Sequence, residues 1–496
     1  MRFRGTHSCA MVFLALTGAA VAGAGSVVAA QDRAPDPIEG TWLGTVVAPQ
    51  GPADIGFRFE RDAHQQLVYA LCFPVMNAYD VSLGAPVTRD GVDYVEPVFN
   101  ARFRMAGDEI AGTFGPGRLA LRLHRAESFP HAPVPPIFPA APAALWTHAL
   151  GAPTWASPSL FEGVLYVGTS GGEFHAVRAG DGTELWNWAG SHRIDGRAAV
   201  TTTRVIFTDG TPDLVCLSRA DGALLWRVPL HDERLAGKPA AENPTFNHRT
   251  ATPLVGDGVV YVGSSDGGVY AIDTVTGEKR WRHEVGAPVF SGIAPVDAGT
   301  LAFGAMDGSV VLLDSVTQKE VLHARVGGAV VTTPVVQGDR ILIGGRDYFL
   351  YGLNRSDGSV AWKFSYWFSW VESTGVLRDG VFYVGASDYR RVTALDPASG
   401  GVVWSTDVRG MDWGTPVVTS DRVFIGTVAQ NIPGTLLQHT GGIMALDRRT
   451  GEVCWQLVAR PAALNEFGGY AGSLACDGER IYAAGFDGNL VALPAR

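Results

Sequence analysis

The sequence predicts an all-β protein in which a small antiparallel β-barrel or sandwich domain precedes an eight-bladed β-propeller. Three observations carry this prediction. A unit of about 40 residues recurs along residues 143–496, and each unit contains four short β-like runs separated by Gly and Asp turn residues. The last unit lacks one strand, and an isolated strand ahead of the first unit can supply it. A period near 40 residues with four strands per unit is typical of propeller blades.

The composition is that of a globular protein with a large core. The 496 residues are 46% hydrophobic and 18% charged, with 62 Gly and 29 Pro that favour turns. The formal net charge is −10, and no long basic run occurs. Nucleic acid is excluded as an expected partner, because phosphate binding needs a surface of Lys and Arg.

Residues 1–30 have the pattern of a secretory signal peptide. Arg2 and Arg4 precede a stretch without Asp, Glu, Lys or Arg that runs to Ala30 and ends in small residues. An uncleaved anchor helix is the alternative, but the Ala and Gly content makes the stretch only weakly hydrophobic, which favours cleavage. We therefore expect an exported protein, periplasmic or secreted, with no membrane span after signal cleavage.

Four cysteines remain after residue 30, and their spacing does not fix a disulfide pairing. They are Cys72, Cys216, Cys454 and Cys476. The sequence contains no C-x-x-C-H motif, so covalently attached c-type haem is excluded.

Residues 36–128 lack the 40-residue unit and predict the small β-domain. Alternating or apolar runs indicate strands at residues 40–46, 56–60, 66–72, 99–105 and 119–124, and residues 112–115 indicate a turn or short strand. Residues 129–142 contain six prolines and predict a stiff, extended linker.

The end of each repeat unit is its most regular part. An Asp or Asn is followed by a Gly, and a Trp stands four residues after the Gly. The acidic or amide side chain can bond its own backbone, the Gly permits a positive φ, and the Trp ring can fill the wedge between blades. We therefore assign a structural role to these tryptophans. They are Trp146, Trp186, Trp226, Trp281, Trp362, Trp404 and Trp455, while Leu322 holds the same place in one unit.

The count of units closes the ring. Residues 472–493 supply three strands, and the strand around Trp146 supplies the fourth, which gives eight blades over residues 143–496. Closure of this kind removes the exposed edges that an open array would have.

The Ala-x-Asp-x-x-Thr-Gly-x-x-x-Trp endings resemble the tryptophan-docking repeats of the PQQ-type, or quinoprotein-type, eight-bladed propellers. The resemblance covers residues 143–496 and implies the fold. It leaves the function open, because the family includes quinoprotein alcohol dehydrogenases as well as cofactor-free exported proteins such as the propeller lipoprotein of the outer-membrane barrel-assembly machinery.

One face of the predicted propeller is the candidate binding face. The segments that enter the inner strands and the loops between second and third strands meet there, and two insertions, Pro229–Arg249 and Ala429–Thr440, enlarge it. The entering segments are polar and aromatic, and their rings could stack on a polar organic ligand. The alternative is an ordinary wet and polar propeller channel. The predicted funnel consists of Trp155, His192, Arg193, Asp195, Asn247, His248, Arg249, Trp370, Glu372, Asp412, Trp413, Glu466 and Tyr470.

A quinone site in this family implies Ca²⁺ held by carboxylate and amide oxygens, a catalytic Asp, an Arg, a Trp floor and a disulfide of adjacent cysteines. Asp412, Glu372 and Arg249 are the catalytic candidates, with Trp413 as a floor. The sequence has no adjacent cysteine pair and no matching Ca²⁺ motif. We therefore expect no cofactor, with PQQ and Ca²⁺ as the alternative. No metal site is expected either, because the spacing of His231, His248 and His439 specifies none.

These observations lead to three functional hypotheses. The first is a non-catalytic scaffold of the cell envelope that binds a small polar ligand or an envelope protein. The second is a divergent PQQ-dependent oxidoreductase of the alcohol or aldose dehydrogenase type. The third is a carbohydrate-binding propeller, because flat rings stack on sugar faces as well as on quinones.

Overall fold

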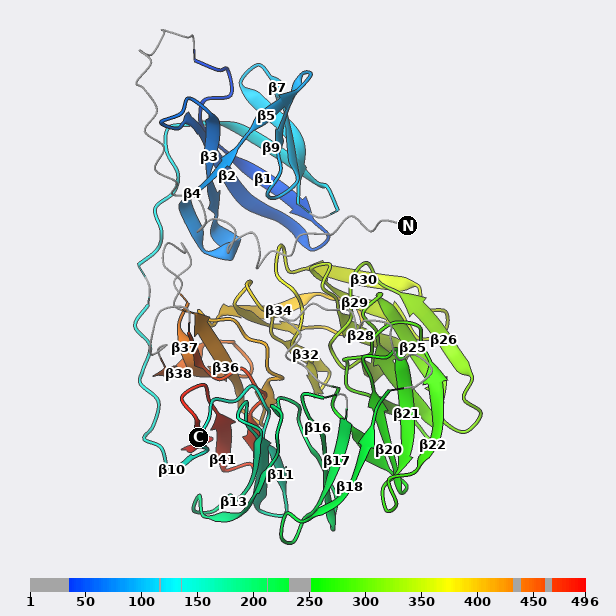
Figure 1. Ribbon diagram of the computed structural model, residues 1–496. Coiled ribbons are helices and arrows are strands. Elements are labelled where there is room, and N and C mark those ends of the chain that lie inside the picture. The colour runs from blue at the N-terminus through cyan, green and yellow to red at the C-terminus, as the bar shows by residue number, and fades with distance from the viewer. Residues whose placement is uncertain are drawn as a thin grey trace. The chain divides into compact units, whose positions relative to one another are not determined.

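The computed structural model describes residues 35–115, 117–134, 136–211, 213–231, 251–430, 439–459 and 466–496. These residues form two compact units, one ending at Pro136 and the other beginning at Ile137 (Figure 1). Among the described residues, no helix is long and apolar enough to cross a membrane. The predicted signal peptide lies outside these ranges, so its cleavage and the domain limits stay predictions.

The N-terminal unit is a nine-stranded antiparallel sheet in the order β4-β3-β2-β1-β9-β8-β7-β6-β5. Its strands are β1 (Gly40–Ala48), β2 (Gly51–Arg61), β3 (Leu67–Phe73), β4 (Ala78–Pro86), β5 (Thr88–Asp90), β6 (Asp93–Glu96), β7 (Ala101–Ala106), β8 (Glu109–Phe114) and β9 (Leu119–Ala126), with a 3-10 turn η2 (Pro74–Met76). The alternating sequences bury one face, where Phe57 packs edge-on against Phe103 and Phe114, with ring centroids 4.9 and 5.7 Å apart. The prediction that an antiparallel β-domain precedes the propeller in the chain is therefore confirmed.

The second unit contains eight antiparallel sheets, seven of four strands and one of five, which confirms the predicted propeller (Figure 1). In chain order the first seven sheets comprise β11 (Ser159–Phe161), β12 (Val164–Gly168), β13 (Glu173–Arg178) and β14 (Glu184–Ala189); β15 (Ala199–Val200), β16 (Arg204–Thr208), β17 (Asp213–Ser218) and β18 (Leu224–Pro229); β19 (Leu254–Gly256), β20 (Val259–Gly263), β21 (Gly268–Asp273) and β22 (Lys279–Glu284); β23 (Ala294–Asp297), β24 (Thr300–Gly304), β25 (Ser309–Asp314) and β26 (Glu320–Arg325); β27 (Val335–Gln337), β28 (Arg340–Gly344), β29 (Phe349–Asn354) and β30 (Val360–Ser365); β31 (Val376–Arg378), β32 (Val381–Val384), β33 (Arg391–Leu395) and β34 (Val402–Asp407); and β35 (Val417–Val418), β36 (Arg422–Gln430), β37 (Gly441–Asp447) and β38 (Val453–Ala459). A further strand, β39 (Phe467–Gly469), pairs with the long β36.

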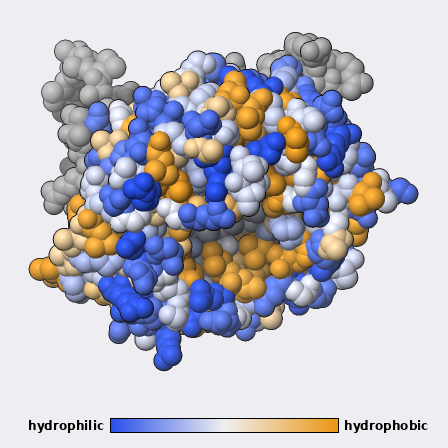
Figure 2. All heavy atoms as spheres, turned by 90° about the horizontal axis from the view of Figure 1, so that it is seen from below, coloured by the Kyte–Doolittle hydropathy of each residue, from blue (hydrophilic) through white to orange (hydrophobic). Residues whose placement is uncertain are grey.

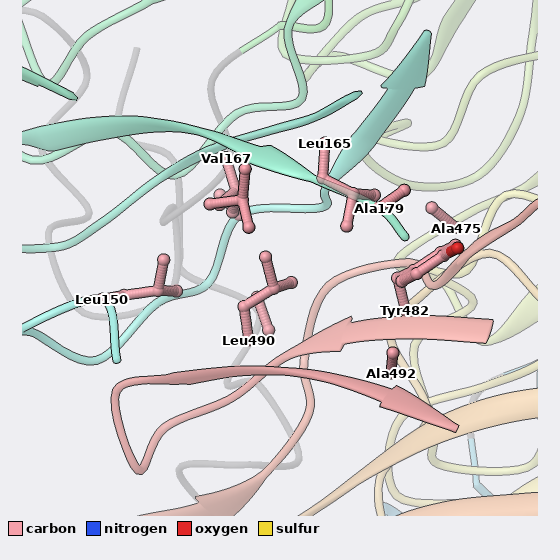
Figure 3. Packing of buried hydrophobic residues seen from close by; sticks show 11 residues of the cluster. Leu150, Leu165, Val167, Ala179, Ala475, Tyr482, Leu490 and Ala492 are labelled. Atoms are coloured by element: carbon pink, nitrogen blue, oxygen red, sulfur yellow. The ribbon is translucent and has the colours of Figure 1, made fainter. Parts of the chain in front are cut away.

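The eighth sheet joins the two ends of the propeller. It has the order β10-β42-β41-β40, in which β10 (Trp146–Ala149) comes before the first blade and β40 (Ala475–Cys476), β41 (Arg480–Ala484) and β42 (Asn489–Pro494) come last. Side chains of the first and last blades face one another across this seam, among them Leu165 and Val167 against Tyr482 and Leu490 (Figure 3). This pairing is the ring closure that the sequence predicted, in which the strand around Trp146 completes the last blade.

The repeated tryptophans dock each blade onto the next one. Trp186 lies opposite the small residue Ala176 on the neighbouring strand of its own sheet. Its Nε1 donates a 2.9 Å hydrogen bond to the carbonyl of Arg219 in the following blade. The ring lies on Gly222 of that blade, which has φ +74°. The same donation joins Trp146, Trp226, Trp362 and Trp404 to the backbone carbonyls of Ala179, Thr274, Pro397 and Arg448.

The described residues of the proline-rich segment that follows the N-terminal sheet form no regular strand, and its role as a stiff linker stays a prediction. Within the propeller unit its last part lies along β38, where the backbone of Ala141 donates to Gln456 and Gln456 donates to Pro139. Phe138 also packs against the side chain of Arg409, whose guanidinium carbon is 4.5 Å from the ring centroid. A space-filling view shows a hollow on one face of the molecule, with hydrophobic residues gathered in it (Figure 2).

Candidate functional site

The strand-entry segments and the loops between second and third strands lie at the same end of the blades. In the described part of the chain, entry segments hydrogen-bond to the loop of the preceding blade. Val289 donates to the carbonyl of Ser264 at 2.9 Å, and Asp412 donates to Ala386 at 3.3 Å. Backbone pairing of this kind fixes the positions of the loops on which binding residues are most often carried.

Four aromatic side chains gather at this end, and we call them the aromatic cluster: Trp155, Trp413, Phe467 and Phe486. Trp155 stacks on Trp413 with centroids 5.5 Å apart and an interplanar angle of 24°. Phe467 and Phe486 meet the ring of Trp155 edge-on, at 5.2 and 4.7 Å. All four rings are only partly buried, and they pack on Met411. The cluster unites residues from before β11, before β35, from β39 and from the β41–β42 turn.

Hydrogen bonds connect the aromatic cluster to an acidic residue. The indole Nε1 of Trp413 donates to the hydroxyl of Ser387 at 2.7 Å, and the backbone of Ser387 donates to the carbonyl of Trp370 at 3.1 Å. Next to Ser387 lies Asp388, which keeps partial solvent access although protein surrounds it. Burial and the charge of Glu372 raise the pKa of Asp388 to about 6, against the opposing effect of Arg390.

Glu372 is held by a cation rather than standing open to a ligand. Its Oε1 accepts from both Nε and a terminal nitrogen of Arg346, at 2.7 and 2.6 Å. The guanidinium also lies over the ring of Trp370, with its carbon 4.5 Å from the centroid. Both members of the ion pair are largely buried, which makes a charge pair of this geometry costly to break.

Asp412 is the most enclosed polar residue of the predicted funnel. Its side chain is fully buried, and neither carboxyl oxygen has a hydrogen-bond partner among the described residues. The backbone of Gly385 lies so close that a Cβ there would stand 2.5 Å from Oδ2. Burial raises the pKa of Asp412 well above its ordinary value, so this carboxyl is protonated more readily than an exposed one.

The other predicted residues are placed more widely. Arg193 forms an ion pair with Asp195, whose carboxylate also accepts from Ser170 at 3.3 Å, while His192 is exposed and pairs with Ser191. Glu466 is exposed, and Tyr470 packs in the apolar core beside Leu474 rather than on an open surface. Asn247, His248 and Arg249 lie outside the described residues, as does most of both predicted insertions.

Sequence analysis missed four residues of this region: Arg346, Asp388, Phe467 and Phe486. A usable signal existed for three of them, because Arg346, Asp388 and Phe486 lie in loops between second and third strands, which were expected at this face. Their Gly- and Asp-rich surroundings were interpreted only as hairpin turns. Phe467 belongs to the extra strand β39, which the repeat pattern did not contain.

The calcium and quinone site implied by the fold family can be tested against these residues. Ca²⁺ needs several oxygen ligands around one position. Glu372 is already engaged by Arg346, and the enclosed Asp412 oxygens face the backbone of Gly385. In the described part of the chain, the group of three possible metal ligands within reach of one ion contains neither residue. Glu372 and Asp412 therefore do not fit the expected calcium site.

Comparison with known proteins identifies a family and several relatives that the chain resembles. The family model PQQ_2, described as "Outer membrane protein assembly factor BamB", matches residues 187–291, 276–367 and 367–496. The outer membrane protein assembly factor BamB of Yersinia pestis is 27% identical over 243 residues, covering 47% of this chain and 58% of that protein. BamB of Burkholderia pseudomallei is 24% identical over 288 residues, covering 54% and 70%. The chain thus spans less than two thirds of the first of these relatives.

Solved structures share the fold at low sequence identity. Quinohemoprotein alcohol dehydrogenase from Comamonas testosteroni superposes with a TM-score of 0.52 at 15% identity, over 71% of this chain and 76% of that chain. Identity at this level supports the architecture alone. Because the family model matches across residues 187–496, which is more than half of the chain, the protein belongs to the PQQ-like propeller family described as outer membrane protein assembly factor BamB.

Proposed function

We propose that this protein is an exported, non-catalytic scaffold of the cell envelope that binds another envelope protein through the aromatic cluster. Its relatives are named as outer membrane protein assembly factors, which favours a protein partner over a small ligand. The observation that carries the proposal is the set of four mutually packed, partly exposed rings at the loop-bearing end of the blades. Aromatic side chains clustered in this way are the commonest anchors of protein interfaces.

The polar surroundings of the cluster fit such an interface. Trp413 is held in place by its hydrogen bond to Ser387, so one ring of the cluster is fixed before a partner arrives, and Trp370 outside the cluster is likewise held by the cation of Arg346. Fixed rings lose little conformational entropy on binding. The carboxylate of Asp388 beside them offers a hydrogen-bond acceptor for backbone N–H groups of an apolar segment. We therefore expect the partner to present an apolar stretch of chain rather than a strongly charged surface.

The test compares capture of envelope proteins by the purified chain and by Trp155→Ala. Loss of an interface anchor of this kind is expected to weaken binding by roughly 30-fold, equivalent to about 2 kcal/mol. Leu224→Ala is the matched control, because Leu224 is 51% exposed on the outer strand β18 of the second blade. A circular dichroism melt establishes that both variants fold. Unchanged capture by folded Trp155→Ala would exclude the aromatic cluster as the binding surface.

A PQQ-type oxidoreductase is the second candidate, and Asp412 is the observation that favours it. A buried carboxyl with a strongly raised pKa is more frequent at functional sites than elsewhere. Calorimetric titration with PQQ, with and without Ca²⁺, tests this candidate directly. PQQ binding that Asp412→Asn abolishes would support the oxidoreductase, whereas no heat at high micromolar PQQ would retire it.

A further inference from the structure

The seam that closes the propeller ring carries a cluster of metal-ligating side chains. His148 on β10, His175 on β13 and Glu184 on β14 each offer a donor atom, and these atoms all lie within 4.8 Å of one another. We propose that the three side chains form a Zn²⁺ site that joins the last blade to the first. Imidazole and carboxylate ligands together suit Zn²⁺ better than the hard cations Ca²⁺ and Mg²⁺.

Two of the three donor separations are close to those around one tetrahedral ion, and the third is no more than 4.8 Å. Glu184 Oε2 lies 3.4 Å from His148 Nε2 and 2.8 Å from His175 Nδ1. Ligands bound to tetrahedral Zn²⁺ at the usual bond lengths are ~3.3–3.5 Å apart, as follows from the geometry of the coordination sphere. The first distance is already in this range, and the second needs a lengthening of about half an ångström. Three protein ligands leave a fourth position for water.

One ring nitrogen of each histidine lacks the hydrogen-bond partner that a buried imidazole nitrogen usually has. His175 is only 4% exposed, and the Nε2 atoms of both His148 and His175 are inaccessible and have no hydrogen-bond partner among the described residues. A buried polar atom without a partner is costly unless another species satisfies it. Glu173 Oε2 lies 3.9 Å from His175 Nε2, so a small rotation would let this carboxylate accept the ring N–H once Nδ1 binds the ion.

A second trio in the same propeller shows what a similar cluster looks like when hydrogen bonds satisfy it. His283 on β22 stands two residues after the docking position of its blade, as His148 does. Glu320 on β26 stands two residues before the docking position of the next blade, as Glu184 does. There one carboxylate oxygen of Glu320 lies 3.1 Å from His283 Nε2, and the other lies 2.9 Å from His323 Nδ1. His323 Nε2 meets Ser309 Oγ at 3.0 Å, so both of its ring nitrogens have partners. This trio is a matched control for the seam cluster.

The location gives the site a structural consequence. β10 is held to β42 by strand pairing, and the docking of Trp146 and the apolar seam hold the last blade to the first. An ion shared by His148 and the two first-blade ligands would add a bond across this seam. We therefore expect Zn²⁺ to stabilise the folded propeller without being required for it to fold.

The test titrates Zn²⁺ into full-length protein that has been stripped with EDTA, using a chromophoric chelator as competitor and thermal melting as the second measurement. The expected result is one tight site per chain and a rise in Tm of roughly 2–6 °C at saturating Zn²⁺. Co²⁺ in place of Zn²⁺ is expected to give the visible absorption of a tetrahedral ion. His148→Ala and Glu184→Gln should lose all three effects, while His283→Ala should keep them.

The variants distinguish a metal site from a simple ion pair. His148 is partly exposed on a short strand, so His148→Ala is expected to fold in EDTA with a Tm close to that of the parent protein. Absence of tight Zn²⁺ binding to the parent protein, or equal Zn²⁺ responses of His148→Ala and the parent, would overturn the proposal. Loss of the response in His283→Ala alone would also overturn it, since the ion would then be bound at the other trio.

Discussion

The contact between a docking tryptophan and the turn glycine of the next blade is expected to contribute measurably to propeller stability. At Gly222, an added Cβ would stand 2.6 Å from Cε3 and 3.0 Å from Cδ2 of the Trp186 ring, so the ring would have to move. That movement would disturb the 2.9 Å bond from Trp186 to Arg219, worth about 0.5–1.5 kcal/mol. The residue would also adopt φ +74°, which costs a residue with a Cβ roughly 1–2 kcal/mol. Gly222→Ala is therefore expected to destabilise the propeller by about 1–3 kcal/mol, after the smaller gain from a stiffer unfolded chain.

The chain contains a control that separates the two costs. Gly163 has the same φ of +74°, but an added Cβ there meets nothing within 4 Å. Gly163→Ala is expected to lose about 1 kcal/mol, from backbone conformation alone. The assay is urea unfolding followed by tryptophan fluorescence, with both variants compared at the transition of the propeller unit. Equal losses in the two variants would refute the reasoning, because the ring contact would then contribute nothing.

Three further predictions follow from individual residues. Gln318→Gly is expected to stabilise the propeller by about 0.5–1 kcal/mol in the same urea assay, because Gln318 holds the turn-glycine position with φ +59°; a loss of stability would contradict this. Asp388→Asn is expected to be more stable than the parent protein at pH 7.5 but not at pH 4. The reason is that the folded pKa of about 6 exceeds the ordinary value of 3.8, so the parent binds more protons folded than unfolded and loses stability as pH rises through this range, by ~3 kcal/mol at most. Trp413→Phe is expected to keep a stacked ring but lose the bond to Ser387, lowering stability by about 1 kcal/mol in thermal melts, and an unchanged melt would show that the bond contributes little.

The propeller could be predicted because its determinants are local and repeated. Every docking Trp except Trp146 stands four residues after a turn Gly, and this short spacing is visible in one sequence without knowledge of distant contacts. Ring closure through β10 was predictable for the same reason, since one strand was missing and one was left over. In the N-terminal unit, β4, β5 and β6 were not predicted, because β5 is a short run of exposed polar residues, β4 contains Gly and Pro, and β6 has only four residues.

The candidate site was less predictable because its contacts join different blades. The stacking of Trp155 on Trp413 brings together residues more than 250 positions apart, and no local pattern records their distance. The pairing of Glu372 with Arg346 depends likewise on the meeting of two loops. Polarity alone suggested that Asp412 faces the channel, yet the entry segment buries it against Gly385. Whether these residues bind a partner stays a prediction.

The pairing of β10 with β42 has a consequence for the order in which the molecule assembles. Trp146 meets Ala492, so the first strand of the propeller to be synthesised has to wait for the propeller's last strand. Closing a loop of this length costs about 5 kcal/mol of chain entropy, against roughly 2 kcal/mol for a tight hairpin. Until the final strands are made, the first and last blades each present unpaired edges to other chains. A permuted chain, with its old ends joined and a new break between two intact blades, should therefore fold faster and aggregate less.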